Sequence, residues 1–172
     1  MQRSSVIMAC LFGALACMAG AAGSARAATA TASVSANNVK PLVLSKVQDL
    51  SFGTITLGPG VWNNATVSVS QAGVLSCSNA NLSCTGAVAA ATYNVQGSNQ
   101  QTVQISCPNF VLTNQTDPTQ TLAMTTNAPA SLVLPNSGFP GINFSIGGSV
   151  TLNSTTSGGT YVGTFNVTAD YQ

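Results

Sequence analysis

The sequence predicts an all-β protein built as an antiparallel sandwich or barrel. Thr and β-branched apolar residues are abundant, and such residues suit a pleated, half-buried surface. Short segments in which apolar and polar residues alternate follow one another along the chain, with Gly, Pro, Asn and Asp between them. No long segment carries the period of an amphipathic helix, so we expect strands joined by loops.

The strands are predicted one by one from this alternation. The clearest is Thr66-Val67-Ser68-Val69-Ser70. Segments 92–96 and 102–106 lie on either side of Gly97-Ser98-Asn99, so we expect them to pair as a hairpin. The other predicted strands are 42–44, 50–55, 122–126, 131–134, 142–146 and 150–152, and breakers such as Gly147-Gly148 separate them.

Both ends of the β-rich region carry an amphipathic strand pattern. Residues 28–36 read A-T-A-T-A-S-V-S-A, which places Ala30, Ala32, Val34 and Ala36 on one face. The segment from Tyr161 to Tyr171 alternates throughout and predicts one long strand with a clear inside and outside. The positions of its inner face, together with a preceding glycine, are Gly159, Tyr161, Gly163, Phe165, Val167, Ala169 and Tyr171.

Charged residues are scarce among the 172 residues, with four Lys or Arg, three Asp and no His. General acid–base catalysis and hydrolytic metal sites depend on His, Glu and Asp, so we expect no enzyme, metal or cofactor. A net charge of +1 with scattered basic residues offers nothing to follow a phosphate backbone, so no nucleic-acid partner is expected. Asp49 and Asp117 are too few and too far apart to argue for calcium, unless loop carbonyls supply further ligands.

The N-terminus carries the features of an export signal. Arg3 precedes an uncharged apolar run from Val6 to Ala22, and Ala25-Arg26-Ala27 matches a cleavage site. We therefore predict a removed signal peptide at 1–27, which leaves no integral membrane span. An N-terminal extension at 28–38 and a single β-domain at 39–172 would follow. The alternatives are a retained anchor and a lipoprotein modified at Cys17.

Three cysteines remain after this cleavage. Cys77 and Cys84 lie on either side of a polar stretch that reads as a hairpin loop, and paired strands there would bring them within bridging distance. Export favours a disulfide between them. Cys107 is then the unpaired thiol, and we expect it to be a small buried apolar residue without a reactive role.

The only tryptophan, Trp62, follows Gly58-Pro59-Gly60-Val61 in a predicted loop. Its ring could stack on a sugar or close one end of the β-domain. A lone aromatic residue without convergent polar partners favours the second interpretation.

Three segments resemble the DUF4402 family of exported bacterial proteins: Leu50–Ile55, Phe144–Gly148 and the ending Gly159–Gln172. That family is similar to subunits of chaperone–usher pili, including the spore-coat-U-like type. The resemblance implies an immunoglobulin-like or pilin-like β-sandwich that lacks its last strand. Such subunits end in a strand with a penultimate aromatic residue and a glycine fourteen positions from the end, and Tyr171 and Gly159 stand at these positions.

The function implied by this resemblance is that of a non-enzymatic structural subunit of a bacterial surface fibre. Residues 28–36 of one copy would complete the sheet of the next beside its C-terminal strand, by donor-strand exchange. The implied partners are copies of itself or related subunits, a periplasmic chaperone and an outer-membrane usher. The protein would pass through the periplasm to the cell surface.

The alternative, from a different class, is a self-complete secreted binding module or adhesin for glycan or matrix. In that case residues 28–36 are a loose leader, and the last strand is an ordinary edge strand of a complete sandwich.

Overall fold

The computed structural model describes residues 27–77 and 79–172. The predicted signal peptide therefore lies, apart from Ala27, outside the described residues. The described part of the chain is all-β with antiparallel pairing and contains no helix. It therefore has no helix that could cross a membrane. The chain divides into two units between Ala36 and Asn37. In the first, residues 27–36 form no strand, and all are exposed.

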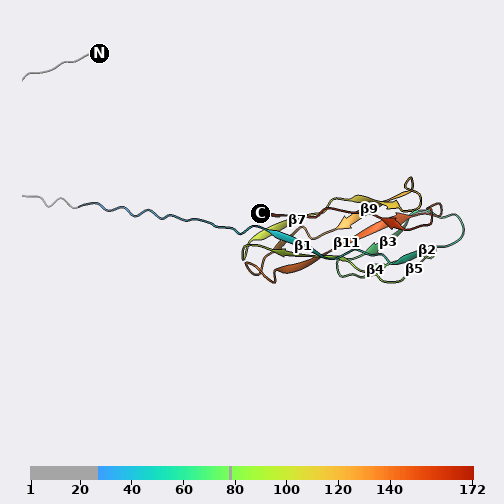
Figure 1. Ribbon diagram of the computed structural model, residues 1–172, viewed down its shortest axis with the longest axis horizontal. Coiled ribbons are helices and arrows are strands. Elements are labelled where there is room, and N and C mark those ends of the chain that lie inside the picture. Colours follow the sequence, from blue (N-terminus) through green and yellow to red (C-terminus); the bar gives the residue numbers. More distant parts are fainter. Residues whose placement is uncertain (1–26, 78) are drawn as a thin grey trace, which may run out of the picture. The chain divides into compact units, whose positions relative to one another are not determined.

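Every strand assigned in the described residues belongs to the second unit (Figure 1). Most are short, and β11 is by far the longest. In order they are β1 (Val43–Gln48), β2 (Thr54–Leu57), β3 (Ala65–Val69), β4 (Leu75–Ser76), β5 (Leu82–Thr85), β6 (Ala91–Gln96), β7 (Thr102–Ser106), β8 (Phe110–Asn114), β9 (Thr121–Asn127), β10 (Ser131–Val133), β11 (Ile142–Leu152), β12 (Tyr161–Val162) and β13 (Thr168–Tyr171).

The largest sheet is organised around β11. Its strand order is β1-β6-β11-β9-β8-β12, with β3 also paired to β11 and β4 paired to β3. The first half of β11, Ile142–Ile146, pairs with β6, whereas Gly148–Val150 pair with β9 and β3 together. The long strand β11 thus pairs with three other strands, β6, β9 and β3.

The prediction that Gly147-Gly148 ends a strand is wrong, because β11 runs through both glycines. Their role is to let neighbouring chains approach closely. A Cβ atom on Gly147 would overlap the backbone of Val69, Ser70 and Gln71, and one on Gly148 would overlap the side chain of Met124. Glycine in a strand interior commonly marks such a close approach.

The predicted hairpin of 92–96 with 102–106 is also wrong. Both strands exist, but β6 pairs with β1 and β11, whereas β7 lies between β10 and β13 in a separate three-stranded sheet. The intervening Gly97-Ser98 is buried and carries the chain from one sheet to the other. Local alternation predicts each strand correctly, but it does not determine the partner.

Side chains from both sheets form the apolar core. One cluster joins β6, β7 and β11 through Val95, Val103 and Ile146, which are almost fully buried. A second gathers around Trp62, Val67 and Met124. β1, β7 and the C-terminus lie toward one end of the second unit, and β2 and β5 lie toward the other (Figure 1).

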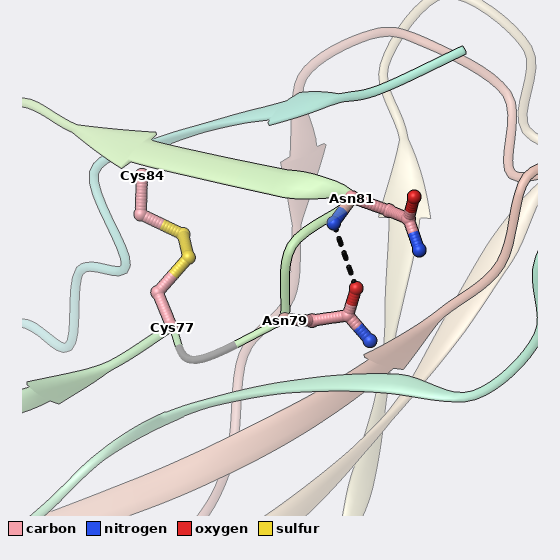
Figure 2. The surroundings of a disulfide bond; sticks show 4 residues. All are labelled: Cys77, Asn79, Asn81 and Cys84. Atoms are coloured by element: carbon pink, nitrogen blue, oxygen red, sulfur yellow. Dashed lines mark hydrogen bonds between the residues drawn. A yellow bond between two sulfur atoms is a disulfide. The ribbon is translucent and has the colours of Figure 1, made fainter.

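Cys77 and Cys84 form the predicted disulfide, shown in Figure 2. The expectation that the strands on either side of the loop pair with each other is wrong. β4 pairs with β3 in the large sheet, and β5 pairs with β2 in a sheet of two strands. The disulfide therefore ties two different sheets together. Within its loop, the Asn79 side chain accepts a hydrogen bond from the Asn81 amide.

We predict that Gly147→Ala destabilises the domain by about 1–3 kcal/mol, the usual cost of forcing extra volume into a packed site. The atoms that its Cβ would meet are backbone atoms of β3 and the turn after it, which cannot move aside cheaply. The measurement is urea unfolding. Gly138→Ala is the matched control, because nothing lies within 4 Å of its Cβ position. Equal unfolding midpoints for the two variants would contradict this account.

Candidate functional site

The C-terminal segment has the alternation that the sequence predicts, but none of its residues is fully buried. From Tyr161 to Tyr171, every odd-numbered residue is half-buried and every even-numbered residue is exposed. The prediction of one continuous strand is wrong in detail. β12 pairs with β8 and β13 pairs with β7, while residues 163–167 between them form no ladder.

The segment that opens the domain behaves in the same way. It runs through β1 and β2, and its inward apolar side chains stop at half burial. They pack against the two core clusters without being enclosed by them. These residues are Leu42, Leu44, Leu50, Phe52, Ile55 and Leu57.

We call the half-buried apolar residues of these two segments the seam: the six residues above together with Tyr161, Phe165, Val167, Ala169 and Tyr171. β1 is the end strand of the large sheet, and β13 is an end strand of the three-stranded sheet. Each therefore keeps one edge without a ladder partner in the described residues. Interior strands such as β3 and β7 bury their inward residues almost completely, whereas the seam residues are half-buried, as are Phe110, Leu112 and Leu122 of β8 and β9.

Aromatic rings line the middle of the seam. Phe165 stacks on Phe110 with ring centroids 4.9 Å apart and meets Tyr93 edge-on at 6.3 Å. Tyr93 in turn stacks on Phe144 at 5.9 Å. Cys107 packs against the same core cluster, is half-buried and forms no disulfide with another cysteine of the described residues.

One end of the seam is held closed by the hydroxyl group of Tyr171. It donates a hydrogen bond to the carbonyl oxygen of Lys40 at 2.6 Å and accepts one from the amide of Ser98 at 2.6 Å. The final strand, the approach to β1 and the crossing loop after β6 thus meet at one oxygen atom. We call this the Tyr171 end of the domain. Because β1 starts there and β13 finishes there, the two strands run in opposite directions.

Gly159, which the resemblance assigned to the assembly strand, precedes β12 and takes part in no ladder of the described chain. Its φ of +140° is a conformation that favours glycine. It lies against the buried side chain of Asn114, whose Nδ2 donates to the Gly158 carbonyl and whose Oδ1 accepts from the Thr116 amide. Gly159 therefore lets the chain pass this amide group where the C-terminal segment begins.

Four of the five charged side chains among the described residues lie on or next to β1 and β13, and the fifth, Asp117, lies between β8 and β9. Lys46 of β1 forms an exposed ion pair with Asp49 at 2.8 Å, and this hydrogen bond and charge raise the pKa of Lys46. Lys40 precedes β1, and Asp170 lies on the outward face of β13. Charged residues on edge strands discourage unspecific pairing with other chains.

Other candidate sites find little support in the structure. Trp62 is only 8% exposed and donates through Nε1 to the Gly58 carbonyl, so it closes the core as expected and does not offer its face to a sugar. Among residues 27–77 and 79–172, no three His, Cys, Asp or Glu side chains gather as metal ligands. The two surface hollows described are shallow; the first is lined mostly by polar residues, and the second by four polar residues beside Ala72, Gly73, Val88, Ala89 and Ala90.

The candidate donor residues are Ala30, Ala32, Val34 and Ala36. All four are exposed, and Val34 reaches 94% exposure. Sequence reasoning identified the C-terminal half of the seam but missed the half formed by β1 and β2. The available signal was the strand spacing of Leu42 and Leu44, which stand two residues apart.

The described residues form an all-β domain in which two end strands, β1 and β13, pack their half-buried residues on the same core cluster. The family model of DUF4402, a domain of unknown function, matches residues 42–171. The chain belongs to this family. A search of curated proteins and a search of solved structures each found no match.

We predict that Tyr171→Phe lowers the free energy of unfolding by about 1–2 kcal/mol, since the change removes two hydrogen bonds and keeps the ring. Urea unfolding measures the loss. The matched control is Tyr161→Phe, which removes a single hydrogen bond to the Ser157 carbonyl and should cost less. A larger loss at Tyr161 than at Tyr171 would show that the Tyr171 hydroxyl does not hold this end.

We also predict that the Cys107 thiol titrates above its ordinary value of 9.0, because burial raises its pKa more than hydrogen bonding at Thr126 lowers it. The raised pKa means that the stability gained from a neutral thiol is complete below pH 9 and is lost as pH rises through the folded-state pKa. The measurement is thiolate absorbance against pH, taken as the difference from a Cys107→Ser variant. A midpoint at or below 9.0 would contradict the half burial of the Cys107 thiol against the core cluster.

Proposed function

We propose that this protein is a structural subunit of a surface fibre, and that its seam receives residues 28–36 of another copy as an added strand. The domain would then be a pilin-like sandwich completed by its neighbour. The observation that carries the proposal is the half burial of every inward apolar residue on two unpaired edges that lie over one core. Strand addition at such an edge is a common mode of recognition.

The backbone supplies much of the expected affinity. β1 and β13 each offer a row of free N–H and C=O groups, so one strand between them could form ladders on both sides. The side-chain contribution is smaller. Val34 is almost fully exposed in its own chain, and burying it would contribute about 1.5–3 kcal/mol, with less from each alanine. Alanines suit a site whose base is already filled by Tyr93, Phe144 and Phe165.

The direction of the added strand follows from a head-to-tail fibre. Residues 28–36 precede Asn37, and the domain begins at the Tyr171 end, where Lys40 is bonded. If the donor enters the next copy from the opposite end, it runs antiparallel to β13 and parallel to β1. Repetition of this contact gives an open polymer rather than a closed pair.

Export and a chaperone belong to the same proposal. A domain with two open edges and a half-buried apolar seam is at risk of aggregation until a strand covers it. A periplasmic chaperone that lends such a strand, and an outer-membrane usher where copies exchange it, would meet this need. The protein would then reside at the cell surface.

The test compares Val34→Arg with Ser35→Arg in cells that make the native fibre. Sheared surface protein is run on a reducing denaturing gel with and without boiling. Unmodified chain should give a ladder that collapses to monomer on boiling. Val34→Arg should abolish the ladder, because a charged side chain would face the core, whereas Ser35→Arg points to the other face of the strand and should preserve it.

Abundant unmodified protein that runs as a monomer in both lanes would overturn the fibre proposal. A ladder that survives Val34→Arg would show that residues 28–36 are not the donor.

A further inference from the structure

Three apolar side chains of the described chain are almost wholly exposed: Val34 at 94%, Val61 at 95% and Phe139 at 90%. The proposed strand exchange accounts for Val34 only. Single exposed apolar residues are common on protein surfaces, so Val61 and Phe139 call for an explanation only if their positions are related.

Phe139 lies at the Tyr171 end. Its loop leads into β11, and the Lys40 side chain donates a hydrogen bond to the carbonyl of Ser137 in the same loop. Lys40 is also bonded through its carbonyl to Tyr171. The exposed ring of Phe139 is therefore carried by the end of the domain from which residues 28–36 leave.

Val61 lies at the other end. Trp62, the next residue, accepts a hydrogen bond from the Ser154 amide through its carbonyl, and Ser154 follows the last residue of β11, Leu152. The eleven residues of β11 thus separate Val61 from Phe139. The two side chains lie at opposite ends of the domain, where they cannot touch within one copy.

The length of the linker brings these two ends together in the fibre. Four residue steps separate Ala36, the last donor residue, from Lys40, which reach about 14 Å when fully extended. The nine donor residues span about 30 Å, and the eleven residues from Tyr161 to Tyr171 about 36 Å, so the donor nearly fills the seam. A donor that fills the seam therefore draws the Tyr171 end of its own domain against the Val61 end of the acceptor.

We propose that the Phe139 loop of each copy packs on the 58–61 loop of the next copy, so that a second copy of this chain covers both exposed residues. This axial contact rests on the proposed function, because strand exchange sets the distance. It would limit bending between successive domains, which the strand and its short linker alone would leave free.

Cross-linking in the native fibre tests the contact. Phe139→Cys and Val61→Cys are introduced together in a Cys107→Ser chain, and sheared fibres are treated with a short bis-maleimide. The cross-linked pair should give a ladder that survives boiling and reduction. The matched control combines Phe139→Cys with Val74→Cys, since Val74 is 65% exposed but follows β3, near the middle of β11, and it should give monomer.

The outcomes separate the two proposals. A boiling-sensitive ladder without cross-linked species overturns the axial contact and leaves strand exchange standing, as does equal cross-linking through Val74. If cells that make the unmodified chain yield only monomer on the gel, both the axial contact and the strand exchange are overturned. A second pair, Gly138→Cys with Pro59→Cys, keeps Phe139 and Val61 in place and repeats the test if the first pair prevents assembly. Failure of both pairs to cross-link in fibres that do form also overturns the contact.

Discussion

A strand edge without a neighbour leaves backbone N–H and C=O groups unpaired, and two of the open edges of this domain, those of β1 and β13, belong to strands that pack on the same apolar cluster. The other features of the site depend on that constraint. The inward residues of β1 and β13 are half-buried, and each strand has one edge without a ladder partner in the described residues. The hydroxyl of Tyr171 holds the two edges together at one end, and the ion pair of Lys46 discourages unspecific pairing at the other end of β1.

Much of the strand content could be predicted because alternation is a local property. The inside and outside of 161–171 follow the predicted pattern, and β7 has the predicted bounds. Partners could not be predicted in the same way. The chain between β6 and β7 reads as a hairpin turn, yet the burial of Gly97 against Leu42, Leu134 and Tyr171 makes it a crossing between sheets. That contact joins residues far apart in sequence.

Two glycines show the same limit of prediction from the sequence. Gly147 reads as a breaker, but β11 needs it because the backbone at the end of β3 passes too close for a side chain. Gly159 was identified through a resemblance, and its structural reason is the buried amide of Asn114. Sequence spacing indicated that both positions matter. The reason in each case is a neighbour that only the folded chain brings near.

The most direct test of the central claim is amide hydrogen exchange along β1 and β13 of a Val34→Arg chain, which cannot donate its own strand, with and without a synthetic peptide of residues 28–38. Our account predicts fast exchange at the amides facing the open edges of both strands, and simultaneous slowing at both when the peptide is added. Slow exchange at these edges in the free chain, or no response to the peptide, would contradict an open seam that accepts a strand.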